Sequence, residues 1–176
     1  YWQTEKYFPD VREILRQEFQ VKYWQDSKSE SLSDLISSTN SIAIHIRRGD
    51  YAANSAYHYI HGLCSLDYYH QSTEWMISKV SNPHFFVFSD EPQWAKENLK
   101  LGFPLTIVDH NGGDRSYEDL RLMSQCKHQI IANSSFSWWA AWLNNHPQKS
   151  VIAPLKWFNN VSVDARDLIP TSWLRL

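Results

Sequence analysis

Short apolar runs alternate with helical segments through most of the chain, and this alternation limits the folds that it can adopt. The apolar runs predict strands over residues 41–46, 84–89, 105–108, 129–132 and 150–153. Helical periodicity is found between them, over residues 66–80, 92–99, 117–126 and 136–145. Strands that alternate with helices of about ten residues form βαβ units. The sequence therefore predicts an α/β fold with a doubly wound, mostly parallel, Rossmann-like sheet.

The residues before the first strand carry a different pattern. Their apolar side chains recur near helical spacing at Phe8, Val11, Ile14, Leu15 and Phe19. This spacing predicts a helix over residues 5–25, the polar run over residues 25–30 predicts a loop, and a second helix is expected over residues 31–37. We therefore expect residues 1–40 to be a helical lead-in and residues 41–176 to be the α/β domain.

The first strand is followed by two adjacent arginines, Arg47 and Arg48, and then by Asp50. A guanidinium donates two parallel hydrogen bonds that match a phosphate or a carboxylate, and ligands of open α/β sheets bind at the carboxyl ends of the strands. Polar residues near this rim are His45, Arg47, Ser89, Asp109 and Asn133. They predict a nucleotide pocket, whereas the alternative for the arginines is a turn closed by an internal ion pair.

The chain has no glycine-rich phosphate loop of the Walker or Gly-x-Gly-x-x-Gly type. Phosphate binding is therefore expected from side chains and from helix amino termini. Asn133, Ser134 and Ser135 precede the helix expected over residues 136–145. Two roles remain open for them, because such residues cap backbone N–H groups and also leave others free for an anion.

Composition excludes several classes of protein. A formal net charge of -2 argues against a nucleic-acid binder, which carries an excess of Lys and Arg. Cys64 and Cys126 are far apart and the eight histidines are scattered, so we expect neither a disulfide framework nor a metal site. No apolar run is long enough to span a membrane and no leader opens the chain, although such a segment upstream of residue 1 remains open.

Five stretches of the chain resemble, in the same order, the α-1,2-fucosyltransferases of glycosyltransferase family 11. They are residues 45–50 (His-Ile-Arg-Arg-Gly-Asp), 61–69, 86–91, 133–139 and 167–170. Residues 1–5 are also similar to a segment of that family, so the resemblance covers essentially the whole chain. Nothing resembles the family's amino-terminal Gly-Gly-Leu-Gly-Asn-Gln block. The chain is therefore expected to be the carboxyl-terminal, donor-binding part of a longer enzyme.

The resemblance implies a GT-B fold, in which two Rossmann-like domains face each other across a cleft, with residues 41–176 as the GDP-fucose-binding one. It implies transfer of L-fucose from GDP-β-L-fucose to the 2-hydroxyl of a terminal galactose in a glycan, with inversion and with neither metal nor cofactor. GDP-fucose and a galactose-terminated glycan would be the partners. A cytoplasmic location is expected, and peripheral association with the inner face of a bacterial membrane is left open.

The resemblance also implies roles for individual residues. The donor-binding residues would be His45, Arg47, Arg48, Asp50, Asp119, Ser134 and Ser135. Arg47 would be the catalytic one, because it would neutralise the leaving diphosphate, while Arg48 would hold the loop or the second phosphate. His45 and Asp119 would contact the guanine base. The alternative for Asp119 is half of a capping box with Ser116.

The general base is not identified from the sequence. Related α-1,6 enzymes have an acid five residues after the motif aspartate, but this chain has Ser55 there. Asp67 is expected to be a first-turn helix residue after Ser65. Two other functions remain open: a fragment that binds the donor without transferring it, and a noncatalytic carbohydrate-binding module that uses exposed Trp and Tyr.

Overall fold

A six-stranded parallel sheet forms the middle layer of the computed structural model, which describes residues 3–21, 26–160 and 162–176. The strands are β1 (Asn40–Ile46), β2 (Pro83–Ser89), β3 (Leu105–Val108), β4 (His128–Ile130), β5 (Val151–Ala153) and β6 (Leu174–Arg175). They lie in the order β3-β2-β1-β4-β5-β6, and every neighbouring pair is parallel. This is the strand order of the Rossmann fold. The predicted α/β class is confirmed.

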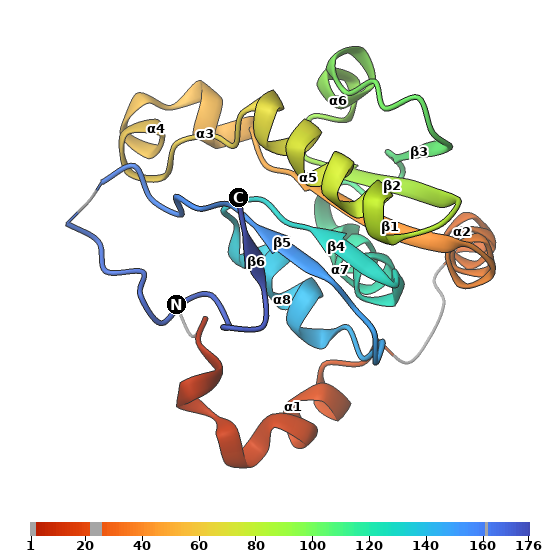
Figure 1. Ribbon diagram of the computed structural model, residues 1–176, viewed down its shortest axis with the longest axis horizontal. Coiled ribbons are helices and arrows are strands. Elements are labelled where there is room, and N and C mark those ends of the chain that lie inside the picture. Colours follow the sequence, from red (N-terminus) through yellow and green to blue (C-terminus); the bar gives the residue numbers. More distant parts are fainter. Residues whose placement is uncertain (1–2, 22–25, 161) are drawn as a thin grey trace.

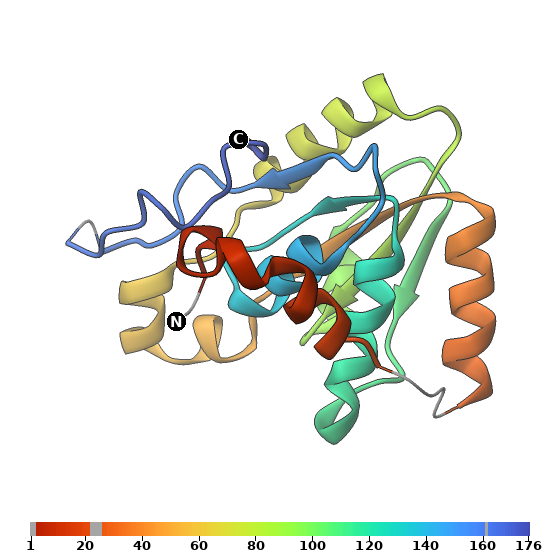
Figure 2. The same ribbon diagram turned by 90° about the horizontal axis from the view of Figure 1, so that it is seen from below.

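Helices cover both faces of this sheet (Figures 1 and 2). The α-helices are α1 (Arg12–Glu18), α2 (Ser27–Ser38), α3 (Gly49–Ala53), α4 (Ser55–His61), α5 (Leu66–Lys79), α6 (Pro92–Asn98), α7 (Ser116–Gln125) and α8 (Ser135–Leu143). Three short 3-10 turns are η1 (Glu5–Tyr7), η2 (Pro9–Val11) and η3 (Gly113–Arg115). Helices α5 and α6 pack on one face, and α2, α7 and α8 pack on the other. The result is a three-layer sandwich.

The core follows the two-residue period of the strands. On β1, Ile42 and Ile44 belong to the cluster that includes Met76 of α5, whereas Ala43 belongs to the cluster that includes Leu122 of α7. Because both faces of the sheet are buried, the strands are apolar almost throughout. This double burial is why the apolar runs marked the central strands so clearly in the sequence.

The predicted helix over residues 5–25 is confirmed only in part, because it is broken into short pieces. The chain forms η1 and η2 and then α1, which ends at Glu18, and residues 22–25 of the predicted helix lie outside the described residues. Only part of the apolar stripe is buried: Phe8 and Leu15 pack against the core, but 57% of Ile14 is exposed. Pro9 has no N–H to donate, so the first turns cannot continue as one regular helix.

Residues 27–30 of the run that was expected to be a loop are helical, because α2 begins at Ser27, and residue 25 lies outside the described residues. The Asp26 carboxylate caps this helix and accepts the backbone N–H of Ser29 at 2.9 Å. Leu32 and Ile36 of α2 are buried in the same cluster as residues of the sheet. Helix α2 therefore shares the core of the α/β domain, and the domain boundary expected at residue 40 stays a prediction.

Helices α3 and α4 and strand β6 were not predicted from the sequence. Helix α4 has no buried residue, so it shows no apolar stripe. The sequence feature that marks the start of α4 is Asn54, whose side chain accepts hydrogen bonds from the N–H groups of Ala56 and Tyr57 as an N-cap. Cys64 and Cys126 are free thiols. No helix within the described residues is long and apolar enough to cross a membrane.

Candidate functional site

A cavity of about 620 Å³ opens at the carboxyl ends of the central strands, beside the point where the strand order reverses between β1 and β4. Ligands of open α/β sheets bind at such switch points, and this volume lies in the usual range for small-molecule sites. Six of the seven predicted donor-binding residues line it: His45, Arg47, Asp50, Asp119, Ser134 and Ser135. The fold thus gathers residues that are up to 90 positions apart in the printed sequence at one rim.

Arg47 lies between two carboxylates on the cavity wall. It directly follows β1, and its guanidinium pairs with Asp50 at 2.7 Å and with Asp90 at 3.0 Å. The guanidinium also lies over the Tyr51 ring, 5.2 Å from the centroid. The internal ion pair considered as an alternative is therefore present, with Arg47 as its cation. This ion pair does not remove Arg47 from the cavity wall. It holds the side chain there before any ligand binds.

Arg48 points to a different part of the molecule and does not line the cavity. Its Nε donates to Glu91 at 3.1 Å, and its guanidinium lies 3.9 Å from the centroid of Trp94. Its backbone N–H donates to Asp90. These contacts suit the alternative in which Arg48 holds the loop. Its predicted contact with the donor stays a prediction.

His45 is a neutral side chain within the site. Only 6% of it is exposed, and burial, followed by the nearby charge of Arg47, lowers its pKa to about 3. Its Nδ1 is buried with no hydrogen-bond partner within the described part of the chain, and its ring lies 5.6 Å from that of Phe136. A neutral imidazole offers one donor and one acceptor. His45 can therefore meet a polar ligand edge without charge repulsion from Arg47.

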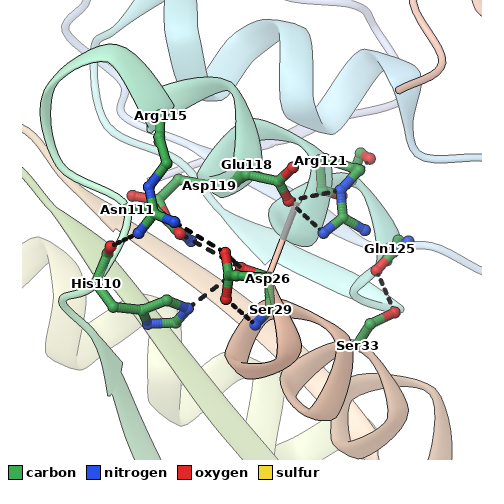
Figure 3. Close-up of polar contacts among 11 residues, drawn as sticks. Asp26, Ser29, Ser33, His110, Asn111, Arg115, Glu118, Asp119, Arg121 and Gln125 are labelled. Carbon is green, nitrogen blue, oxygen red and sulfur yellow. Dashed lines mark hydrogen bonds and ion pairs between the residues drawn. The ribbon is translucent and has the colours of Figure 1, made fainter. Parts of the chain in front are cut away.

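Asp119 is held by a side chain from the preceding loop (Figure 3). Its Oδ1 accepts a hydrogen bond from Asn111 Nδ2 at 2.9 Å. Burial is the main cause that raises its pKa to about 6, with the neighbouring Glu118 adding to it. The predicted capping box is absent, because the N-cap of α7 is Arg115, where no side chain makes a capping bond. Asp119 is thus a cavity residue rather than a helix cap.

The amino terminus of α8 reaches the same cavity. Ser134 is the N-cap of this helix, but its hydroxyl makes no capping hydrogen bond within the described residues. Simple capping by Ser134 therefore does not occur. Helix amino termini present N–H groups and partial positive charge, which attract anions. This end of α8 is consequently suited to phosphate oxygens.

Asn133 was expected at the rim but does not line the cavity. It is buried, and its amide donates to the carbonyl oxygens of His61 at 2.8 Å and of Trp157 at 3.2 Å. The segment that it holds turns at Gly62, whose φ is 70° and where a Cβ would lie 2.5 Å from the Asn159 amide. Asn133 therefore fixes the wall that carries His61.

Sequence reasoning missed an aromatic wall formed by α3 and α4. Tyr51, Tyr57 and His61 line the cavity, and the Tyr51 and His61 rings stack 4.5 Å apart. Burial lowers the pKa of His61, although the charge of Asp50 opposes this effect. Residue 61 opens one of the stretches that carry the family resemblance, and that was the available signal. Such a wall can pack against the apolar face of a sugar or a base.

The charged side chains on the cavity wall are mostly acidic. Arg47 shares this wall with Asp50, Asp90, Asp109 and Asp119. An anionic ligand would therefore depend on Arg47 and on the N–H groups of α8. No group of three or more His, Cys, Asp or Glu side chains lies close enough to hold a metal ion within residues 3–21, 26–160 and 162–176.

Comparison with known proteins agrees with this architecture. The sequence profile described as Glycosyl transferase family 11 matches residues 1–174. Alpha-1,2-colitosyltransferase of Escherichia coli is 42% identical over 100% of this chain and 61% of its own length. O-antigen biosynthesis glycosyltransferase WbnK of Escherichia coli is 38% identical over 78% of this chain and 45% of its own length. Galactoside alpha-(1,2)-fucosyltransferase 1 of Bos taurus is 27% identical over 78% of this chain and 40% of its own length.

These matches extend over 78% to 100% of this chain but only 40% to 61% of the relatives' own length. The predicted family is confirmed, because the profile covers residues 1–174 and a relative more than 30% identical is matched over most of the chain. The chain belongs to glycosyltransferase family 11.

Proposed function

We propose that this chain is the donor-binding part of a galactoside α-1,2-fucosyltransferase. It would bind GDP-β-L-fucose in the switch-point cavity and support inverting, metal-independent transfer of L-fucose to the 2-hydroxyl of a terminal galactose in a glycan. The observation that carries the proposal is the convergence of His45, Arg47, Asp119 and Ser135 on one cavity. Family membership supports it, and so does the similarity to relatives that include α-1,2-fucosyltransferases.

The guanine base would bind beside Asp119 and His45. Guanine presents two adjacent N–H donors on one edge, and a carboxylate accepts from both at once, whereas uracil has only one donor there. His45 is uncharged and adjoins the same cavity, where it would complete the contacts with the base. Selection of GDP over UDP follows from this arrangement.

The diphosphate would bind between Arg47 and the amino terminus of α8. A guanidinium forms bidentate bonds with phosphate, and the uncapped end of α8 would add backbone N–H donors near Ser134 and Ser135. During transfer, the bond between the sugar C1 and the diphosphate oxygen breaks while the acceptor oxygen attacks C1 from the opposite face. Donors fixed beforehand stabilise the negative charge that grows on the diphosphate.

The group that removes the acceptor proton is not assigned. Ser55, which stands where related α-1,6 enzymes have an acid, is exposed and does not line the cavity. Asp67 is an exposed residue in the first turn of α5, which Ser65 caps by accepting the N–H of Tyr68. The proton would pass to another part of the protein or, late in the reaction, to the diphosphate itself.

A second candidate sugar is colitose, because the relative that is 42% identical is an alpha-1,2-colitosyltransferase. The nucleotide contacts proposed above do not depend on which of the two sugars is attached. Competition between GDP-fucose and GDP-colitose for the same site, followed by single-turnover transfer with each, would distinguish these donors. The cytoplasmic location and the peripheral membrane association rest on the family resemblance alone and remain part of the proposal.

GDP is expected to raise the melting temperature of this chain, and UDP is expected to raise it much less, because Asp119 accepts two N–H groups from guanine. Differential scanning fluorimetry with millimolar nucleotide measures this difference. A folded sample with no shift in GDP would contradict the donor site. A carbohydrate-binding module would instead be stabilised by glycans without GDP, and binding of GDP-fucose without any transfer would indicate the donor-binding fragment.

A further inference from the structure

Asn111 is a buried side chain that joins the loop before α7 to two other elements (Figure 3). Only 1% of it is exposed, its Nδ2 donates to Asp119 at 2.9 Å, and its Oδ1 lies 3.3 Å from the hydroxyl of Ser29 on α2. The orientation of the carboxamide is fixed, because only its NH₂ group can donate to a carboxylate. The other orientation would bring two oxygens together.

The backbone around Asn111 is tied to the start of α2. Arg115 donates to the carbonyl oxygen of His110 and pairs with the carboxylate of Asp26 at 3.1 Å. Asp26 also caps α2 by accepting the N–H of Ser29. The loop therefore cannot move without breaking contacts that also define the first turn of α2. These contacts connect the loop that carries Asn111 to α2, at the wall of the cavity that Asn111 also lines.

A hydrogen bond from Asn111 affects both the geometry and the charge of Asp119. The bond uses one lone pair of the Asp119 Oδ1 atom and leaves the remaining lone pairs of the carboxylate for a ligand. It also stabilises the ionised form, which burial disfavours. The ionised form is the one that accepts two hydrogen bonds from a base edge.

We propose that Asn111 is a positioning residue that aligns the Asp119 carboxylate with the two N–H donors of a guanine base, and that Ser29 of α2 supports it. This inference rests on the proposed function and deepens it by naming what holds the base-recognition carboxylate. Neither Asn111 nor Ser29 was among the residues expected from the sequence.

Several charged or titratable groups lie near Asp119, and Glu118 is the one that adds to the rise in its pKa. The charged or titratable residues that share its network or its cavity are Asp26, His45, Arg47, Asp50, Tyr51, Tyr57, His61, Asp90, Asp109, His110, Arg115 and Glu118. Ser33 provides a matched control, because it lies on α2 and bonds to Gln125 without touching this network. Ser33→Ala removes the same hydroxyl as Ser29→Ala from the same helix.

The first test needs no ligand. The Asp119 carboxyl resonance is followed by ¹³C NMR during a pH titration of the wild-type chain, Asn111→Leu, Ser29→Ala and Ser33→Ala. Loss of the Asn111 hydrogen bond is expected to move the Asp119 midpoint upward by about one pH unit. Ser29→Ala is expected to move it less and in the same direction, and Ser33→Ala is expected to leave it unchanged.

The second test is a double-mutant cycle with GDP-fucose, whose diphosphate is esterified at both ends. Asn111→Leu is expected to weaken binding at pH 7 by ~3- to 10-fold in the wild-type background. The same change is expected to have no effect when Asp119 is already alanine, because a residue that acts through Asp119 loses its influence with it. A merely structural role would weaken binding equally in both backgrounds. Isothermal titration calorimetry measures all four affinities.

The outcomes separate this inference from the proposed function. Absence of GDP-fucose binding by the wild-type chain would overturn the proposed function and this inference with it. Binding that depends on Asp119, together with an unchanged midpoint and affinity in Asn111→Leu, would overturn this inference alone. If near-UV circular dichroism shows that Asn111→Leu is unfolded, Asn111→Ala, which removes the same NH₂ donor, decides in its place, and a wild-type midpoint and affinity would overturn the inference.

Discussion

Replacing Arg47 by alanine is expected to lower the rate of sugar transfer by roughly 100- to 1000-fold. Removing one preorganised donor from a developing negative charge typically costs about 3 to 4 kcal/mol of transition-state stabilisation, which corresponds to this loss. Arg47→Lys keeps the charge but loses the planar pair of donors, so its turnover is expected to fall at least tenfold, a loss of ~1.4 kcal/mol. The test is to measure kcat with GDP-fucose and a galactose-terminated acceptor, with each substitution made in the native protein that contains these residues.

Arg48→Lys is the matched control for this prediction. Arg48 is the next residue in the chain, but Glu91 and Trp94 hold it away from the cavity. Its replacement is expected to change the melting temperature more than the turnover. Near-normal turnover of Arg47→Lys would remove Arg47 from contact with the diphosphate. Equal losses in both variants would contradict a role in transfer that is specific to Arg47.

Asp119→Ala is expected to weaken GDP binding by roughly 10- to 150-fold. Hydrogen bonds to a charged group contribute about 1.5 to 3 kcal/mol, and this loss of affinity corresponds to that range. If Asp119 had only a structural role, its replacement would change the free energy of unfolding and leave affinity unchanged. Measuring the melting temperature and the dissociation constant on the same variant separates the two roles. An unaltered dissociation constant would exclude Asp119 from the site.

The pH dependence provides an independent control on Asp119. Burial raises its pKa to about 6, above the ordinary 3.8, so ionised Asp119 costs stability to the fold at neutral pH. This cost is removed as the pH falls from about 6 towards 3.8, and the carboxylate acceptor of the folded protein is lost as the pH falls through about 6. Affinity for GDP-fucose is therefore expected to fall below pH 6 in the wild type. Asp119→Asn is expected to bind weakly with no such dependence.

The sequence predicted the sheet because its central strands are buried on both faces. An apolar run such as residues 84–89 has few structural alternatives to a buried strand when it lies between helical segments. The cavity was also predictable, because polar side chains that follow parallel strands must meet at one rim. His45 and Arg47 are the clearest cases, since they stand at the carboxyl end of β1.

The parts of the fold and of the site that were not predicted depend on contacts between residues that are far apart in the sequence. Ser29 and Asn111 are 82 positions apart, and no local pattern links them. Arg47 and Arg48 are neighbours with the same chemistry, yet only the folded turn directs one to the cavity and the other to Trp94. Helix α4 was missed because it buries no residue and therefore has no apolar stripe in its sequence. Its position depends on tertiary contacts, which sequence periodicity does not reveal.

The acidic wall of the cavity has a consequence for the speed of donor association. An approaching diphosphate meets one guanidinium but four carboxylates, so the long-range field opposes its entry even though the contacts inside favour it. Dissolved ions screen the distant repulsion more than the short contacts. The association rate constant for GDP, measured by stopped-flow fluorescence, is therefore expected to increase as sodium chloride is added. A basic phosphate site would show the opposite trend.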